Sequence, residues 1–255
     1  MDFIVSAATD IGIVKQTNQD SFSVRVFNTA IGKVVLAVLC DGMGGLEKGE
    51  VASGSLVNAF CKWSETRLPA LCQTGITDNI IREEWTKIAV DFNEKIKSYS
   101  ASFGANMGTT LTALLLTEKR YYIINVGDTR AYEIYDGVKV LTKDQTVVAR
   151  EIEMGILTPE QAKVDPRRSV LLQCVGASPS VYPDFFFGET KLNSVYMLCS
   201  DGFRHEITEN EIYSYLGPNV MLDDAGMQKN MQYLIQLDMN REERDNISVL
   251  SVRTF

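Results

Sequence analysis

The sequence predicts an α+β fold in which antiparallel sheets pack against helices, and three observations carry this prediction. Apolar runs of strand length fill both ends and the middle of the chain. Two adjacent stretches with helical periodicity separate the first strand-like runs from the next group. Short pairs such as Glu118-Lys119 and Asp136-Gly137 divide later runs in the manner of hairpin turns, whereas a doubly wound parallel sheet would alternate strands with helices.

The N-terminal half of the chain supplies strands and then helices. Strands are expected at Phe3–Ala8, Phe22–Phe27 and Lys33–Cys40, the last an almost continuous apolar run. Helices are expected over Gly49–Arg67 and from Thr77 to about Ser98, because apolar residues recur there at helical spacing. Thr77 has the side chain of a helix N-cap.

The rest of the chain continues as a meander and then mixes strands with short helices. The meander is expected at Thr110–Thr117, Arg120–Val126, Arg130–Tyr135 and Lys139–Thr142. Residues 143–168 show short helical patterns, in which Thr158 can cap a helix with Pro159 at its first position. Further strands are expected at Val170–Cys174, Asp184–Phe187, Val195–Cys199 and Ile247–Val252, and further helices near Glu209–Tyr215 and at Asp223–Gln236.

Composition limits the classes of function. The chain has 255 residues, of which 45% are hydrophobic, without a linker or repeat, which favours one domain over residues 1–255. A formal net charge of −8 argues against a nucleic-acid partner, and no apolar run is long enough to span a membrane. The N-terminus lacks the features of a signal peptide, and the five cysteines are scattered, so we expect a cytoplasmic protein with reduced thiols. Nothing in the pattern requires more than a monomer.

Acidic residues stand beside apolar runs in distant regions of the chain. Asp41 and Asp201 each follow such a run and precede glycine, Asp245 stands just before the last run, and Asp20 closes the polar stretch KQTNQD. Carboxylates gathered in a poorly solvated site cannot all stay ionised without cations, so bound divalent metal is the simplest interpretation. A lone Asp-Gly is usually only a turn, and that alternative remains open at this point.

The residue types narrow the kind of metal. Magnesium and manganese prefer oxygen ligands, and the glycines at 42, 44 and 45 would let the Gly42 carbonyl face a cation. The single histidine, His205, excludes a site with several imidazoles, and we expect it to be a surface residue beside Asp201. The Asp-x-Asp of haloacid-dehalogenase phosphatases, the P-loop and the EF-hand pattern are all absent.

Seven motifs, in order and across nearly the whole chain, resemble those of the metal-dependent protein phosphatases of the protein phosphatase 2C family, bacterial single-domain type. They are TDIGIVKQTNQDSF, LCDGMGG, GTTLTALL, NVGDTRAY, LTPEQAKVDPRRSVLLQCVG, LCSDGF and RDNISVL. The resemblance implies a four-layer α-β-β-α sandwich with two central antiparallel sheets. It also implies a mobile flap subdomain at about residues 144–176.

The resemblance further implies a role for each acidic position. Asp41 would bridge two Mn²⁺ or Mg²⁺ ions, and Asp201 and Asp245 would complete the site of one of them. The Gly42 carbonyl would hold the other ion, with Asp20 contributing directly or through water. Asp128 matches a position that the family uses for a third, weaker ion, with Asp201 nearby, whereas Asn246 would orient the end of its strand.

The implied activity is hydrolysis of phosphoserine or phosphothreonine by metal-activated water, on phosphoproteins made by a serine/threonine kinase. Lys15 stands where the family usually has a phosphate-binding arginine, so it could attract phosphate without the bidentate fork. Gln19 replaces a frequent glutamate, and Met43 replaces the histidine of eukaryotic members. These departures leave an alternative, a catalytically weak family member that binds phosphoproteins or serves as a regulatory partner.

Overall fold

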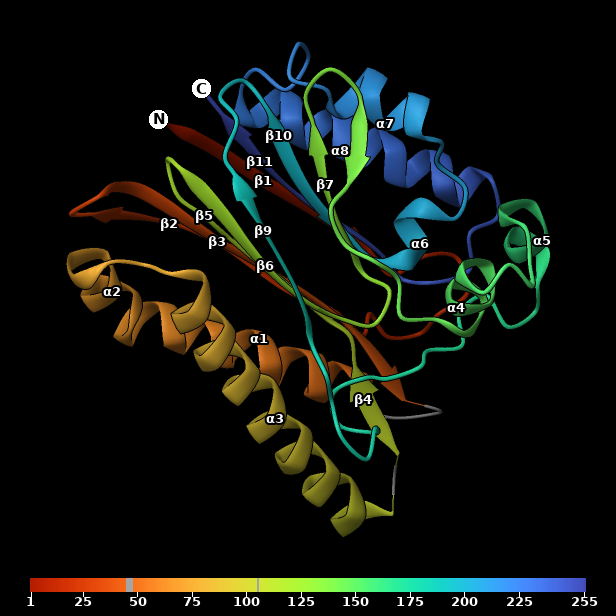
Figure 1. Cartoon of the computed structure of the whole chain (residues 1–255). Helices are drawn as coiled ribbons and strands as arrows, with labels where there is room; N and C mark the ends of the chain where they lie inside the picture. The colour runs from red at the N-terminus through yellow and green to blue at the C-terminus, as the bar shows by residue number, and fades with distance from the viewer. Residues whose placement is uncertain (45–47, 105) are drawn as a thin grey trace.

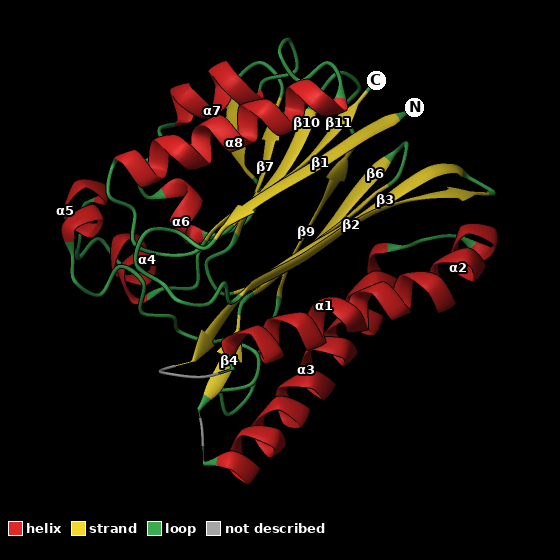
Figure 2. Ribbon diagram, turned by 180° about the vertical axis from the view of Figure 1, so that it is seen from behind, coloured by secondary structure: helices red, strands yellow, loops and turns green. Residues whose placement is uncertain are grey.

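The computed structural model describes residues 1–44, 48–104 and 106–255. Within these ranges a pair of antiparallel sheets lies face to face between layers of helices (Figures 1 and 2). This arrangement confirms the predicted α-β-β-α sandwich. No helix of the described ranges is both long and apolar enough to cross a membrane. Gly45, one of the glycines expected to form a tight turn, lies outside the described residues.

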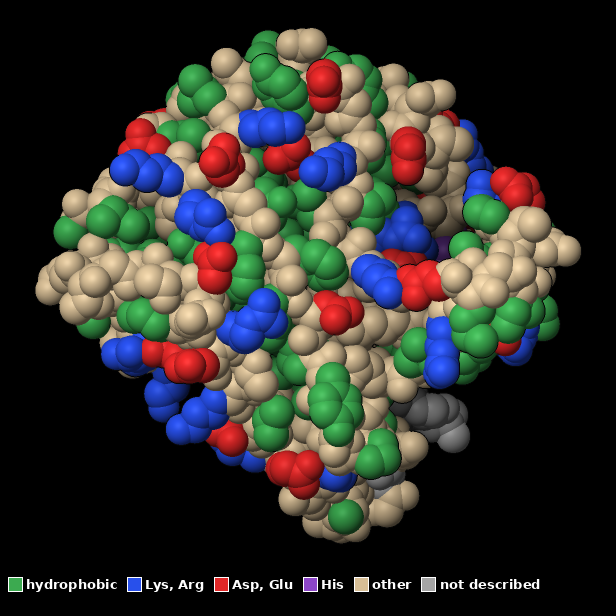
Figure 3. Space-filling view, viewed as in Figure 1, with side chains coloured by type: hydrophobic (Ala, Val, Ile, Leu, Met, Phe, Trp, Pro, Cys, Tyr) green, Lys and Arg blue, Asp and Glu red, His purple; other side chains and the backbone are tan. Residues whose placement is uncertain are grey.

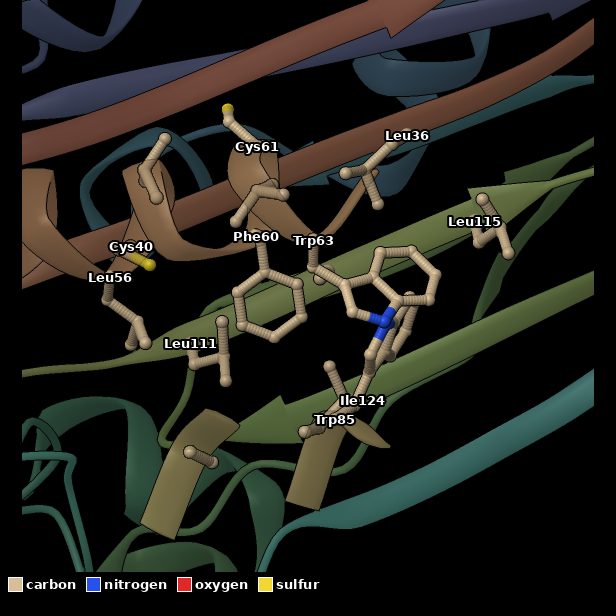
Figure 4. Close-up of a cluster of buried hydrophobic side chains, with 14 of the residues drawn as sticks. Leu36, Cys40, Leu56, Phe60, Cys61, Trp63, Trp85, Leu111, Leu115 and Ile124 are labelled. Carbon is tan, nitrogen blue, oxygen red and sulfur yellow. The ribbon is translucent and has the colours of Figure 1, made fainter. Parts of the chain in front are cut away.

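The first sheet has the strand order β2-β3-β5-β6-β9, and a short strand, β4, extends the edge of β3. Its strands are β2 (Asp20–Thr29), β3 (Gly32–Gly44), β4 (Met107–Thr109), β5 (Leu111–Leu116), β6 (Arg120–Val126) and β9 (Asp184–Glu189). Its outer face is covered by α1 (Gly49–Thr66), α2 (Leu68–Thr74) and α3 (Asp78–Phe103). Figure 4 shows the resulting core, in which Phe60 and Trp63 of α1 meet Trp85 of α3 edge to face at 5.5 and 5.4 Å between ring centroids.

The second sheet has the strand order β1-β11-β10-β7-β8 and is covered by two helices. Its strands are β1 (Phe3–Asp10), β7 (Arg130–Ile134), β8 (Val138–Val140), β10 (Val195–Cys199) and β11 (Ile247–Thr254). The helices on its outer face are α7 (Glu209–Leu216) and α8 (Asp224–Asn240). A third apolar cluster, including Leu39, Leu114 and Leu198, fills the space between the sheets.

The short helices α4 (Val147–Glu153), α5 (Pro159–Val164) and α6 (Asp201–Arg204) gather at one end of the sandwich (Figure 1). Two caps follow the sequence prediction, since the Thr77 hydroxyl accepts from the Ile80 N–H and Thr158 forms a capping box with Gln161 before Pro159. The space-filling view shows a hollow beside this end, where basic, acidic and histidine side chains gather (Figure 3).

Three sequence predictions about local structure were wrong. The meander expected over residues 110–142 is divided, because β5 and β6 pair in one sheet while β7 and β8 pair in the other. Gly127, with φ of 99°, lies where the chain passes from one sheet to the other. A Cβ at this position would lie 2.7 Å from Thr110 Cγ2, so a larger residue would clash. Residues 170–174 form only an isolated bridge between Leu171 and Thr146 rather than a strand.

The third error concerns where β3 ends. It continues past Asp41 to Gly44, because β4 pairs with residues 42–44. The helices α2 and α6 and the strand β4 also escaped the sequence analysis, since each is too short to show a period.

Candidate metal centre

Asp20 and Asp41 lie directly opposite each other at the end of the first sheet. The antiparallel register pairs them across β2 and β3, where two like charges destabilise a sheet. Thr110, just before β5, fixes the backbone of Asp41 through two hydrogen bonds. The Asp41 N–H donates to the Thr110 hydroxyl at 2.9 Å, and the Asp41 carbonyl accepts from the Thr110 N–H at 2.8 Å. The fold therefore holds two carboxylates together rather than letting them separate.

Gly42 follows in a crowded stretch of backbone. A Cβ at this position would lie 2.4 Å from the Gly49 carbonyl oxygen and 2.5 Å from that of Gln19, so glycine is required by close approach. With its amide oriented to satisfy both ends, the Gln19 side chain donates to the Gly42 carbonyl at 3.3 Å and accepts from the Gly49 N–H at 3.2 Å. The residue that departs from the family pattern thus contacts the predicted carbonyl ligand.

The second sheet brings Asp201 and Asp245 to the same end of the sandwich. Asp201 opens α6 directly after β10, and Asp245 stands two residues before β11, which pairs with β10. Gly202 packs on the Asn246 carbonyl, where a Cβ would lie 2.2 Å from the oxygen. Asn246 accepts from the Gln19 N–H at 2.9 Å and donates to the Ile11 carbonyl at 2.9 Å, so it orients this strand end as expected.

Burial and mutual repulsion shape the ionisation of these carboxyls. Burial and the charges of Asp201 and Asp245 raise the pKa of Asp20 to about 7. Burial, followed by the charges of Asp20 and Asp201, raises the pKa of Asp41 well above its usual range. The cluster is thus unfavourable in its fully ionised form unless cations are added.

Unpartnered oxygens distinguish the centre chemically. Both Asp20 carboxylate oxygens and Asp201 Oδ1 are buried without a hydrogen-bond partner. Both oxygens of Asp238 are also buried and unpartnered, but burial, followed by the charge of Glu243, raises the pKa of that carboxyl to about 9, so it can stay protonated. Several converging carboxyls, rather than one orphaned group, therefore mark the metal centre.

The donor set fits hard cations, although it is not preassembled. Within the described ranges, no three His, Cys, Asp or Glu side chains are arranged so that they alone could hold an ion. Mg²⁺ usually keeps several waters and needs one or two carboxylates, so this spread is compatible with binding. Some of the spread has a visible cause, since Lys15 Nζ lies 2.6 Å from Asp245 Oδ1. The predicted phosphate-binding residue is thus brought to the centre, with its side chain 39% exposed.

Asp128 lies beside this group, where burial and the charge of Asp201 raise its pKa to about 7, and it is contacted by an arginine that the sequence analysis missed. Arg204 Nη2 lies 3.0 Å from the Asp128 carbonyl oxygen and 3.3 Å from Asp128 Oδ2. Arg204 also approaches Asp144 Oδ2 at 3.4 Å, and Arg130 holds Asp144 through two contacts of 2.7 Å. One signal in the sequence was available: Arg204 follows Asp201 by three residues, which places both on one side of a helical turn.

His205 is not the surface residue that the sequence predicted. Its side chain is 12% exposed and bridges two carboxylates, with Nδ1 3.1 Å from Glu243 Oε2 and Nε2 3.5 Å from Asp201 Oδ2. Although burial opposes the charged imidazole, the hydrogen bond to Glu243 and the charge of Asp201 raise the pKa of His205. The sequence did not predict that His205 is largely buried, because its neighbours in sequence are polar and because α6 and the loop before β11 meet only in the fold.

Comparison with known proteins agrees with the motifs. Residues 13–232 match the family model described as Protein phosphatase 2C. A putative protein phosphatase 2C-type of Streptococcus pyogenes is 31% identical over 251 residues, covering 97% of this chain and 96% of the relative.

Solved structures show the same fold. The S. agalactiae serine/threonine phosphatase aligns over 100% of both chains with a TM-score of 0.85 and 27% identity. The catalytic domain of the serine/threonine phosphatase PstP, in complex with two manganese ions, aligns over 98% of this chain and 97% of its own, with a TM-score of 0.78 and 25% identity.

Proposed function

The chain belongs to the protein phosphatase 2C family, and on that premise we propose that it hydrolyses phosphoserine and phosphothreonine in proteins with the help of bound Mn²⁺ or Mg²⁺. The observation that carries the proposal is the convergence of carboxyls at one end of the sandwich: Asp20 and Asp201 have buried oxygens without a partner, and Asp41 lies directly opposite Asp20. Repulsion within this group is offset when divalent cations bind.

In the proposed centre Asp41 would be available to both ions. Asp201 and Asp245, from the second sheet, would hold one of them. The Gly42 carbonyl and Asp20, from the first sheet, would hold the other, with Gln19 beside that carbonyl. When bound, such ions supply a hydroxide nucleophile at neutral pH and offset charge on the phosphoryl oxygens.

The protein's own groups then position the substrate. The Lys15 ammonium attracts the phosphate as a point charge, and it is exposed enough to exchange Asp245 for a substrate oxygen. No side-chain nucleophile is required, because the phosphoryl group passes directly to water. The flap at about residues 144–176 includes α4 and α5, and its Ser169 hydroxyl lies 3.5 Å from Asp201 Oδ2, so we assign to the flap a role beside the substrate.

We further propose that residues 1–255 act as one catalytic domain, as a monomer in the cytoplasm, on the products of a serine/threonine kinase. The relatives are described as serine/threonine phosphatases, which supports a phosphoprotein substrate. The alternative, a catalytically weak family member, is supported by the contact of Gln19 with the Gly42 carbonyl and by the replacement of arginine at Lys15. The aspartates at positions 20, 41, 201 and 245, brought to one end of the sandwich, argue against it, since a binding module has no chemical need for them.

The test is hydrolysis of a phosphothreonine peptide with Mn²⁺, with Mg²⁺ and with chelator. We expect phosphate release to require metal and to fall by about 1,000-fold or more in Asp41→Asn, because losing several kcal/mol of charge stabilisation costs tenfold per 1.36 kcal/mol. Asp136→Asn, in the exposed hairpin turn after β7, is the matched control and should keep full activity.

Two outcomes would contradict the proposal. Metal-independent release, or an active Asp41→Asn variant, would remove Asp41 from the chemistry. No release from folded protein with either metal would favour the weak, phosphoprotein-binding alternative.

A further inference from the structure

Arg204 is a buried cation at the position expected for a third metal ion. Its side chain is 12% exposed, and its Nη2 contacts both the carbonyl and the carboxylate of Asp128. Asp128 itself is 6% exposed at the side chain, so water screens the pair poorly. The guanidinium is therefore a cation already in contact with Asp128.

The carboxylates around Asp128 already face two internal cations. Asp128 and Asp144 contribute two negative charges and Arg130 and Arg204 two positive ones, while Asp201 of the core group adds a further negative charge. Arg130 is committed to Asp144 through its bidentate contact, which leaves Arg204 as the partner of Asp128. A divalent ion added beside Asp128 would meet a neighbouring guanidinium in a poorly solvated place, where repulsion between like charges is strong.

The core carboxyls differ in this respect. Neither Asp20 nor Asp41 forms an ion pair within the described residues, and the Asp20 oxygens are unpartnered. The residues at Asp20 and Asp41 therefore fit a metal ion, whereas those at Asp128 do not.

We propose that the Arg204 guanidinium takes the place of a third metal ion, so that this protein binds two ions and not three. The inference rests on the proposed function for the two core ions. It adds that Asp128 is not a metal ligand while Arg204 is present, and that a fixed positive charge stands beside the centre at any metal concentration.

The first experiment counts Mn²⁺ ions bound per chain, by calorimetry and by electron paramagnetic resonance of free Mn²⁺, without substrate. We expect two ions in the wild type and two, with unchanged affinities, in Asp128→Asn. A wild type that binds three ions and an Asp128→Asn variant that binds two would overturn the inference. This comparison needs no change at Arg204, so it decides the matter even if variants at that position fail to fold.

The second experiment removes the internal cation. Arg204→Gln should gain a third, weaker ion, and the double variant Arg204→Gln/Asp128→Asn should lose it again. Arg204→Lys, which keeps the charge, is the control and should still bind two ions. If Arg204→Gln is folded and still binds only two, the guanidinium does not exclude the third ion and the inference is wrong.

These measurements are separate from the proposed function. A protein that binds two ions but releases no phosphate would refute the phosphatase proposal and leave the role of Arg204 intact. A protein that hydrolyses phosphopeptide and binds a third, Asp128-dependent ion would support the phosphatase proposal and refute the role of Arg204. A protein that binds no Mn²⁺ would contradict both.

Discussion

The two groups of carboxylates at the end of the sandwich are compensated in different ways. Asp20 and Asp41 face each other across two strands, and no arginine or lysine contacts either within the described ranges of the chain. Asp128 and Asp144 lie nearby, yet two arginines contact them. The difference teaches that acidity alone does not identify a metal ligand. What matters is whether the fold supplies its own cation.

The largest expected effect comes from breaking the compensated group. Arg130→Leu leaves the largely buried Asp144 without its bidentate partner, and removing one member of a buried pair typically costs about 3–5 kcal/mol in the free energy of unfolding. Urea unfolding of both proteins would measure the loss.

The matched control is Arg25→Leu, which breaks the exposed pair with Glu65 and should cost at most about 1 kcal/mol. Equal, small losses in the two variants would mean that the Asp144 group does not depend on its arginines, and the contrast between the two groups would disappear.

A smaller effect should appear in the pH dependence of the metal-free protein. The pKa of Asp20, raised to about 7, and the raised pKa of Asp41 mean that the folded state holds protons that the unfolded state has released above about pH 4. Stability should therefore fall as the pH rises from 5 to 8, by up to about 1.4 kcal/mol per pH unit for each proton held. Asp128 acts in the same sense, because burial and the charge of Asp201 raise its pKa to about 7, whereas Asp144 acts in the opposite sense, because Arg204 and Arg130 overcome the effect of burial and lower its pKa.

Urea unfolding at pH 5, 6, 7 and 8, in chelator and in saturating Mn²⁺, measures this dependence. Asp20→Asn should reduce the slope in chelator, and Mn²⁺ should flatten it for the wild type, since bound cations replace the protons. If the free energy of unfolding falls equally steeply with pH in chelator and in Mn²⁺, the carboxyls with raised pKa values are not the groups that bind the metal.

The contrast between the two groups also explains what sequence could predict. Asp41, Asp201 and Asp245 were selected because each stands beside an apolar run, and Asp20 because it closes a polar stretch; an apolar run shows where a strand lies even when, as in β3, its end is missed. The sequence analysis missed Arg204, Glu243 and the partners of His205. These residues contact groups that are distant in sequence, and their own segments show no hydrophobic periodicity. Charge compensation is a property of side chains meeting across elements, so it becomes visible only in the fold.

The smallest effect concerns Lys15, whose ammonium contacts Asp245 of the predicted metal centre. Both side chains of the Lys15–Asp245 pair are more than a third exposed, so Lys15→Ala should change the free energy of unfolding by less than about 1 kcal/mol. If the ammonium binds substrate phosphate instead, the variant should raise KM about 3- to 10-fold with little change in kcat, as expected for lost binding energy of roughly 1 kcal/mol.

Lys33→Ala, which breaks a similarly exposed pair with Asp2 at the other end of β3, is the control and should leave KM unaltered. Lys15→Arg should restore or lower KM through bidentate contact. An unaltered KM in Lys15→Ala would instead make Lys15 only a partner of Asp245, and the substrate phosphate would then depend on other groups for positive charge.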